Sequence, residues 1–220
     1  FAPHAPYTLA DATFARIGTL AEQLGLPIHI HIHETADEVR DSLKQYGVRP
    51  LERLAGLGLL GPNFIGVHAI HVNHAEIDLL AQNGCHVAHC PTAGLKLGSG
   101  IAPVNRFIAA GVNFGFGTDG PASNNRLDLF GEMRLASLLA KGASGDAASL
   151  PAAAALKAAT LDAARALNLD SRLGSLVPGK RAAKGYVLLR EVLERSHRVA
   201  IARVVIRTRE HLALVMPLGH

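Results

Sequence analysis

Histidine and carboxylate side chains suited to metal-assisted hydrolysis recur along the first part of this chain. Nine of its twelve histidines lie within the first 89 residues. His31 is followed three residues later by Glu34, and His68 and Asp119 come further along. A Zn²⁺ ion held by His and Asp lowers the pKa of a bound water toward about 7, a Glu can move the proton, and a His can stabilise a tetrahedral oxygen. These residue types therefore suit hydrolysis at an electron-poor carbon.

The spacing of these residues indicates that they meet. Residues 28–34 alternate Ile and His before the glutamate, so three histidines are expected on one face of a strand and three isoleucines on the other. His68, His89 and Asp119 each end a further expected strand. Taken singly, the histidines could be a hydrogen-bonded ladder or structural strand ends, and Asp119 could cap a turn or helix. The order His, Glu, His, Asp on separate strand ends is what indicates a site.

The elements that must position these residues are strands alternating with helices. Strands are expected at residues 27–33, 64–68, 84–89 and 112–117. Helices are expected at about 8–24, 36–46, 50–57, 74–82, 102–110, 127–141 and 152–167, the last broken near Thr160. This alternation predicts parallel βαβ units, and polar residues at the carboxyl ends of successive parallel strands are typical of a (β/α)8 barrel. We therefore expect an α/β fold that is the C-terminal part of such a barrel; a doubly wound sheet remains open, although no glycine-rich phosphate loop follows a strand.

The composition predicts a globular protein without a membrane partner. The chain is 49% hydrophobic and 18% charged, and no apolar run reaches the ~18 residues of a membrane span. The only cysteines, Cys85 and Cys90, are too close in the chain for a disulfide that would stabilise the fold. A reducing, cytoplasmic location is therefore expected.

Two features suggest that the chain is a fragment. Its 220 residues are fewer than the ~250 of a usual complete barrel, and Phe1 opens directly in the motif Phe-Ala-Pro-His-Ala-Pro-Tyr. We therefore expect a barrel that is incomplete at its N-terminus.

Charge indicates a boundary near the C-terminal end. Residues 1–183 hold fifteen Lys/Arg and fifteen Asp/Glu, whereas residues 184–220 hold seven Lys/Arg and three Glu. The whole net charge of +4 therefore lies in the last segment. A shift of this kind predicts a different origin or role for that segment.

Residues 1 to about 182 resemble the amidohydrolase superfamily, in the branch of the 5-methylthioadenosine/S-adenosylhomocysteine deaminases and the related triazine hydrolases. The motifs that carry the resemblance are Pro-His-Ala-Pro-Tyr at 3–7, His-Ile-His-Ile-His-Glu-Thr at 29–35, Val-His-Ala-Ile-His at 67–71, His-Cys-Pro-Thr at 89–92, Leu-Lys-Leu at 95–97 with Ser-Gly-Ile-Ala-Pro-Val at 99–104, and Gly-Thr-Asp-Gly at 117–120 with Ser-Asn-Asn at 123–125.

The resemblance implies a role for each residue of the expected site. His31 is a zinc ligand, chosen over His33 because it stands three residues before Glu34, the acid/base that also binds substrate. His68 is the catalytic histidine that holds the attacking water and the oxyanion. Asp119 is the last metal ligand and can take a proton from the water, and His4 contacts the nucleoside. One zinc ion, or another divalent metal, is expected per site.

The implied reaction replaces the 6-amino group of an adenosine-like purine with oxygen and releases ammonia. A hydrolase of the same branch acting on guanine-type purines or s-triazines is the alternative enzyme. Two departures bear on activity. The paired His-x-His of the family should precede this chain, so we expect little activity from the chain. In addition, Ala93-Gly94 stand where the branch commonly has Ser-Asn.

The C-terminal segment resembles a different family. After a Val-Pro-Gly-Lys-Arg stretch at 177–181, the sequence at 184–191 and 199–212 is similar to bacterial Ku, a DNA-end-binding protein. We therefore expect a partial amidohydrolase barrel at 1–176 and a foreign tail at 177–220. Binding of nucleic acid is expected only if the tail is functional, and a homo-oligomer is a further expectation.

Overall fold

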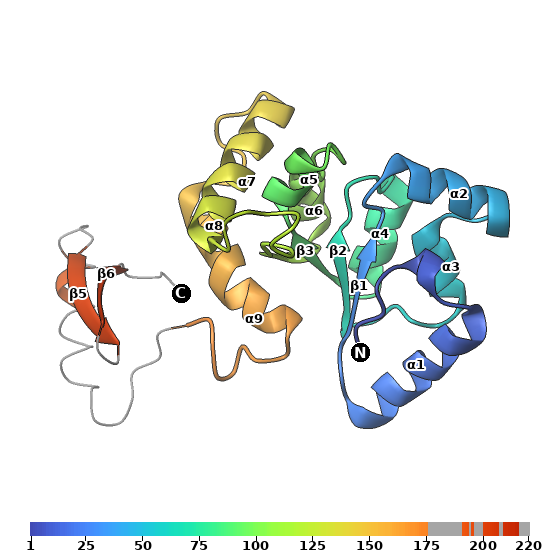
Figure 1. The fold of residues 1–220 in the computed structure, drawn as a ribbon. Helices are drawn as coiled ribbons and strands as arrows, with labels where there is room; N and C mark the ends of the chain where they lie inside the picture. Colours follow the sequence, from blue (N-terminus) through green and yellow to red (C-terminus); the bar gives the residue numbers. More distant parts are fainter. Residues whose placement is uncertain (176–190, 194, 196–199, 207–208, 216–220) are drawn as a thin grey trace. The chain divides into compact units, whose positions relative to one another are not determined.

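A computed structural model describes residues 1–175, 191–193, 195, 200–206 and 209–215 of the chain. It divides into two compact units, Phe1–Ser175 and Leu176–His220, drawn as ribbons in Figure 1. Among the helices in these ranges, none has the length and apolar character needed to cross a membrane.

Four parallel strands form the sheet of the first unit. They are β1 (Ile28–Ile32), β2 (Phe64–His68), β3 (His86–His89) and β4 (Asn113–Phe116). Each pairs with the next along the chain, in the order β1-β2-β3-β4, and helices surround them in Figure 1. Sequential parallel order is that of neighbouring barrel strands, whereas a doubly wound sheet reverses its order at a switch point. The expected α/β fold of barrel type is confirmed for the described part of the chain.

The helices lie close to the expected ranges, with three differences. The sequence did not predict the short 3-10 turn at Pro6–Thr8 or the short helix at Pro91–Lys96. The expected break near Thr160 is a π-helical turn inside a continuous helical run. The helical elements are η1 (Pro6–Thr8), α1 (Asp11–Leu24), α2 (Ala36–Tyr46), α3 (Pro50–Gly56), α4 (His74–Gln82), α5 (Pro91–Lys96), α6 (Val104–Ala110), α7 (Leu129–Ser144), α8 (Ala152–Lys157), the π turn η2 (Ala158–Asp162) and α9 (Ala163–Ala166).

Local side-chain bonds explain why two of these helices begin where they do. Thr35 Oγ1 accepts a hydrogen bond from the backbone N–H of Glu38 at the start of α2, and Asn73 Oδ1 accepts one from Glu76 N at the start of α4. Each satisfies a helix N–H that has no partner within the helix. Gly47, in the left-handed conformation at φ 74°, ends α2.

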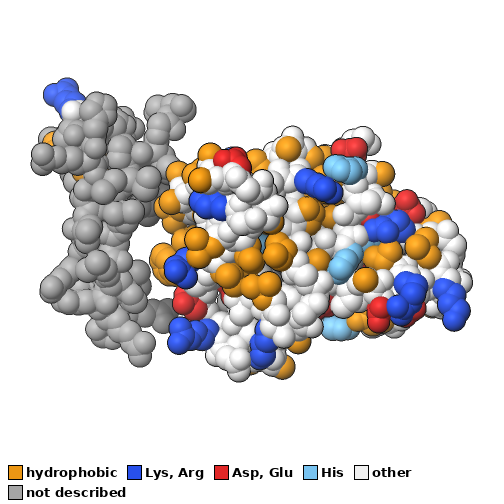
Figure 2. All heavy atoms as spheres, turned by 90° about the horizontal axis from the view of Figure 1, so that it is seen from above, with side chains coloured by type: hydrophobic (Ala, Val, Ile, Leu, Met, Phe, Trp, Pro, Cys, Tyr) orange, Lys and Arg blue, Asp and Glu red, His pale blue; other side chains and the backbone are white. Residues whose placement is uncertain are grey.

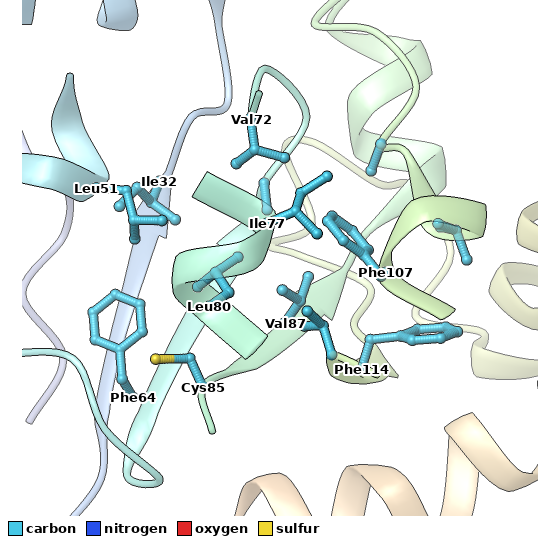
Figure 3. Close-up of a cluster of buried hydrophobic side chains, with 14 of the residues drawn as sticks. Ile32, Leu51, Phe64, Val72, Ile77, Leu80, Cys85, Val87, Phe107 and Phe114 are labelled. Carbon is cyan, nitrogen blue, oxygen red and sulfur yellow. The ribbon is translucent and has the colours of Figure 1, made fainter. Parts of the chain in front are cut away.

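The core lies against the isoleucine face of β1. Ile28, Ile30 and Ile32 are all at most 5% exposed, whereas His29 and His31 between them point to the other face and are not buried. Figure 3 shows Ile32 beside Leu51 and, further along, the buried side chains that continue this core across β2, α4 and β3. Burial of one face therefore determines which face of β1 is left for polar chemistry.

His33 departs from the expected alternation. It follows the end of β1 in a left-handed conformation, at φ 53°, and its side chain is 0% exposed. Because the strand has ended, its ring does not share the face of His29 and His31. The expectation that all three histidines line one strand face is therefore wrong for His33.

The second unit contains an antiparallel pair, β5 (Ala200–Ile206) and β6 (Arg209–Val215), in which Ala200 pairs with Val215 and Ile206 with Arg209. Much of the expected tail at 177–220 lies outside the described residues. Its foreign origin and its likeness to Ku stay predictions.

We expect Gly66→Ala to destabilise the first unit. A Cβ at this position in β2 would lie 2.9 Å from Ile32 Cγ2, and Ile32 is a β-branched side chain that is 1% exposed. Overpacking of this kind typically costs about 1–3 kcal/mol. The free energy of unfolding in urea, followed by circular dichroism, measures the change.

Gly56→Ala is the matched control for this substitution. Gly56 ends α3 with nothing within 4 Å of its would-be Cβ, so the same added methyl should be neutral or stabilise by up to about 1 kcal/mol. Equal unfolding free energies for the two variants would contradict the packing described for Gly66.

Candidate metal centre

Three side chains converge beyond the carboxyl ends of the strands. Ligand atoms of His31, His68 and Asp119 all lie within 4.8 Å of one another. His31 is on β1, His68 ends β2, and Asp119 follows β4. Residues separated by up to 88 positions in the sequence thus form one cluster, as expected from their positions at strand ends. Figure 2 shows that several histidine side chains of this unit also reach the surface.

Hydrogen bonding to His4 orients the His31 ring. His31 Nδ1 lies 2.7 Å from the backbone oxygen of His4. A carbonyl only accepts, so Nδ1 carries the hydrogen and Nε2 is left with a free lone pair. The same carbonyl accepts the His31 backbone N–H at 3.0 Å. The His4 ring lies 4.8 Å from the His31 ring, in an edge-to-face arrangement, so the segment expected to contact substrate borders the cluster.

His68 is the most enclosed member of the cluster. Its side chain is 1% exposed, and its Nε2 lies 3.7 Å from Glu34 Oε2 and 3.9 Å from Asp119 Oδ2. Burial lowers the pKa of His68; the charges of Glu34 and Asp119 oppose this shift, and His31 adds to it. The neutral ring is therefore favoured, and a neutral ring can accept a proton or bind a metal ion.

Asp119 presents one carboxylate oxygen to the cluster. Its Oδ1 accepts a hydrogen bond of 2.7 Å from the backbone N–H of Gly120, while Oδ2 faces His68. The residue has φ 59°, in the left-handed region that non-glycine residues seldom adopt. The turn after β4 thus aims the side chain back toward β2.

Glu34 is held by a residue that the sequence analysis did not single out. Glu38 accepts hydrogen bonds from the backbone N–H groups of His33 at 2.9 Å and Glu34 at 2.8 Å. Burial raises the pKa of Glu38, and these two bonds oppose the rise. The Thr35-x-x-Glu38 spacing is that of a capping box, in which Glu38 would bond the backbone N–H of Thr35. The carboxylate instead binds the two residues before Thr35, and the spacing did not indicate that.

A second unpredicted contact set lies behind His33. His33 Nε2 lies 2.9 Å from Glu76 Oε1, and Arg49 donates to both oxygens of Glu76 at 2.9 and 2.8 Å. Burial alone would raise the pKa of Glu76, but the bonds from His33 and Arg49 outweigh it and hold the pKa at about 2. Nothing in the spacing of these three residues indicated that they would meet.

His89, which the sequence left open between ligand and structural residue, is not part of the cluster. It ends β3, is 3% exposed and lies 6.2 Å from the Phe116 ring, centroid to centroid. Burial, with a smaller effect of His68, lowers its pKa to about 4. It is therefore a neutral, buried histidine beside the site.

The cluster fits a divalent metal ion of the zinc type. Two imidazoles and one carboxylate are ligands that zinc accepts. His31 Nε2 is left free by the bond to His4, and His68 directs its Nε2 toward Glu34 and Asp119. The two rings and the Asp119 carboxylate thus offer ligand atoms within 4.8 Å of one another.

Comparison with known proteins defines the class. The model of the Amidohydrolase family matches residues 1–207, and the chain belongs to this family.

Within the family, similar relatives include two deaminases. A 5-methylthioadenosine/S-adenosylhomocysteine deaminase of Teredinibacter turnerae is 48% identical over 182 residues, which are 83% of this chain and 41% of the relative. The corresponding deaminase of Saccharophagus degradans is 51% identical with the same coverage. This chain thus spans about 41% of the length of these relatives.

Solved structures agree with these relatives. A zinc-bound adenosine deaminase from Xanthomonas campestris is 53% identical with a TM-score of 0.80, over 83% of this chain and 42% of that one. An atrazine chlorohydrolase of Arthrobacter aurescens complexed with zinc is 29% identical with a TM-score of 0.75, over 79% and 38%.

We expect Glu76→Gln to destabilise the first unit at neutral pH and to lose this effect in acid. Removing one partner of a buried ion pair typically costs about 3–5 kcal/mol. Because folding lowers the pKa of Glu76 from 4.5 to about 2, its ionisation contributes stability above pH ~4.5, and this contribution of about 3 kcal/mol is lost as the pH falls toward ~2. Urea unfolding of the wild type and the variant at several pH values gives the difference.

Glu22→Gln provides the control for this titration. It removes the same charge from an exposed position on α1, and we expect a change within about 0.5 kcal/mol at every pH. A wild-type advantage over Glu76→Gln that does not shrink between pH 5 and pH 2 would contradict the low pKa.

Proposed function

We propose that this chain carries the metal-binding and proton-transferring part of a zinc-dependent deaminase that hydrolyses adenosine-like nucleosides. Candidate substrates are 5-methylthioadenosine, S-adenosylhomocysteine and adenosine. The observation that carries the proposal is the convergence of His31, His68 and Asp119, with Glu34 3.7 Å from His68. The deaminases that resemble the chain at 43–53% identity support the substrate class.

In this proposal, His31 and Asp119 hold the zinc ion, with His68 beside them. The ion, when bound, lowers the pKa of water so that the water can attack at neutral pH. The His31 tautomer set by His4 leaves Nε2 available, and Asp119 Oδ2 faces inward and can accept the proton of the attacking water.

Glu34 and His68 complete the proposed chemistry. Water adds to C6 of the purine, its oxygen becomes the 6-oxo group, and the 6-amino group leaves as ammonia. Glu34, whose turn donates two backbone hydrogen bonds to Glu38, carries a proton to the ring nitrogen and then to the departing amine. His68, with its lowered pKa, is neutral when it orients the water. It can then stabilise the charge that develops on the oxygen of the attacking water. His4, at the edge of the cluster, is proposed to contact the nucleoside.

An s-triazine or guanine-type substrate is the second candidate. The structural likeness to triazine hydrolase and to guanine deaminase, with TM-scores of 0.75 and 0.73, supports this alternative substrate class. The identity to those proteins is only 29%, against 53% for the adenosine deaminase, so the nucleoside is preferred. DNA-end binding by the tail, a homo-oligomer and a cytoplasmic location also remain proposals.

We expect the purified chain to bind zinc and Asp119→Asn to weaken this binding. A neutral amide replaces an anionic ligand, so the loss should exceed the roughly 10–100-fold that removal of an outer-shell partner costs. Competition with a chromophoric chelator measures the affinity. Asp146→Asn, which removes the same charge from an exposed loop, is the control and should leave the affinity unchanged. A wild-type chain that binds no zinc contradicts the metal centre.

We expect Glu34→Gln to reduce turnover while zinc stays bound. The test replaces the matching segment of the Teredinibacter turnerae relative with residues 1–175. It measures ammonia release from the three nucleosides, guanine and an amino-s-triazine, and chloride release from a chloro-s-triazine. Loss of a general acid/base lowers kcat by roughly 10²–10⁴-fold, and the zinc content should be that of the unsubstituted hybrid. A hybrid that prefers the triazine would replace the nucleoside proposal, and a Glu34→Gln hybrid with full kcat would exclude Glu34 as the acid/base.

A further inference from the structure

The turn that carries Asp119 is bonded to a buried side chain of its own loop. Asn124 is 2% exposed, and its Nδ2 donates a hydrogen bond of 2.9 Å to the backbone oxygen of Thr118, the residue directly before Asp119. The backbone N–H of Asn124 donates to the oxygen of Gly120, directly after Asp119, at 3.0 Å. Asn124 therefore bonds the residues on both sides of Asp119, which has the left-handed backbone conformation.

Glu132 holds Asn124 in turn. Its side chain, on α7 and 2% exposed, accepts the second Nδ2 hydrogen of Asn124 at 2.8 Å. The side-chain oxygen of Asn124, Oδ1, accepts the Arg126 backbone N–H at 3.0 Å. Both amide hydrogens and the amide oxygen of Asn124 are thus used, so the side chain cannot rotate without losing bonds inside the protein.

The same carboxylate reaches the loop after the neighbouring strand. Glu132 Oε2 accepts the backbone N–H of Thr92 at 3.0 Å, in the first turn of α5. One buried carboxylate therefore connects the first turn of α5, which follows β3, with the loop that follows β4. Burying a carboxylate is costly unless its hydrogen bonds are satisfied, and here each oxygen accepts one hydrogen bond.

We propose that Asn124 and Glu132 form a positioning pair that fixes the backbone turn at Asp119 and so aims its carboxylate at the metal centre. This inference rests on the proposed role of Asp119 as a metal ligand. Both side chains act on Asp119 through the Thr118 carbonyl, which Asn124 binds and Glu132 reaches through Asn124. Because the Thr118 bond depends on the Asn124 side chain, and the position of that side chain on Glu132, loss of either member should loosen the turn.

The test compares Asn124→Ala, Glu132→Gln and the double variant with the wild-type chain. Glu132→Gln keeps the shape of the side chain and provides a mild variant should Asn124→Ala fold poorly. Asn105→Ala is the matched control, because Asn105 also donates from Nδ2 to a backbone oxygen, that of Ala140 at 2.9 Å, but from α6. Each protein is measured for zinc affinity by chelator competition and, without metal, for hydrogen–deuterium exchange of residues 117–121.

We expect Asn124→Ala and Glu132→Gln each to weaken zinc binding by about 10–100-fold and to speed exchange at residues 117–121. Since the two act in one chain, the double variant should be no worse than the worse single variant. Asn105→Ala should lose stability yet keep the wild-type zinc affinity, which separates positioning from a general structural role. Wild-type zinc affinity and wild-type exchange in Asn124→Ala would overturn the inference.

Failure of the proposed function gives a different result. If the wild-type chain binds no zinc, the metal centre is wrong, and exchange at residues 117–121 alone decides the positioning pair. Protection in the wild type that is lost in Asn124→Ala then supports the pair, and equal exchange in the two proteins overturns it.

Discussion

Parallel pairing of consecutive strands is the constraint on which the rest of this structure depends. In the register of β1 with β2, Ile32 lies opposite His68, and the carboxyl ends of all four strands fall at one edge of the sheet. Side chains that follow these ends must therefore meet, however far apart they stand in the sequence. The hydrophobic face of β1 makes the arrangement specific, because a shift by one residue would bury His29 and His31 and expose the isoleucines.

The backbone conformation at the strand ends determines the directions in which these side chains point. His33, His68 and Asp119 all have positive φ, between 53° and 72°. Non-glycine residues adopt this region at a cost of about 1–3 kcal/mol each and persist in it only where the surroundings hold them. Buried or half-buried acids supply that support for two of the turns: Glu38 binds the N–H groups at 33 and 34, and Glu132 acts on the turn at 119 through Asn124.

The electrostatic environment of the cluster follows from the same enclosure. Burial favours the neutral form of His68 and His89, while the carboxylates of Glu34 and Asp119 stay partly exposed beside them. Neutral imidazoles and accessible carboxylates are what binding of a divalent cation and transfer of a proton both need. Behind the site, Glu76 keeps its charge because His33 and Arg49 bind its carboxylate, so this buried acid serves structure.

The sequence by itself indicated most of the strand and helix order, because periodicity is a local signal. It placed His31, Glu34, His68, His89 and Asp119 at strand ends, and the choice among them came from the resemblance to the amidohydrolases. The parallel strands bring His31, His68 and Asp119 together, with Glu34 beside His68, and leave His89 outside the cluster. Only the tertiary structure decided that His33 leaves the strand face to meet Glu76, that Glu38 and Glu132 hold the site turns, and that Pro91–Lys96 forms a helix. Those contacts join segments whose approach depends on how helices pack on the sheet, and the packing geometry is not encoded in the spacing of any one segment.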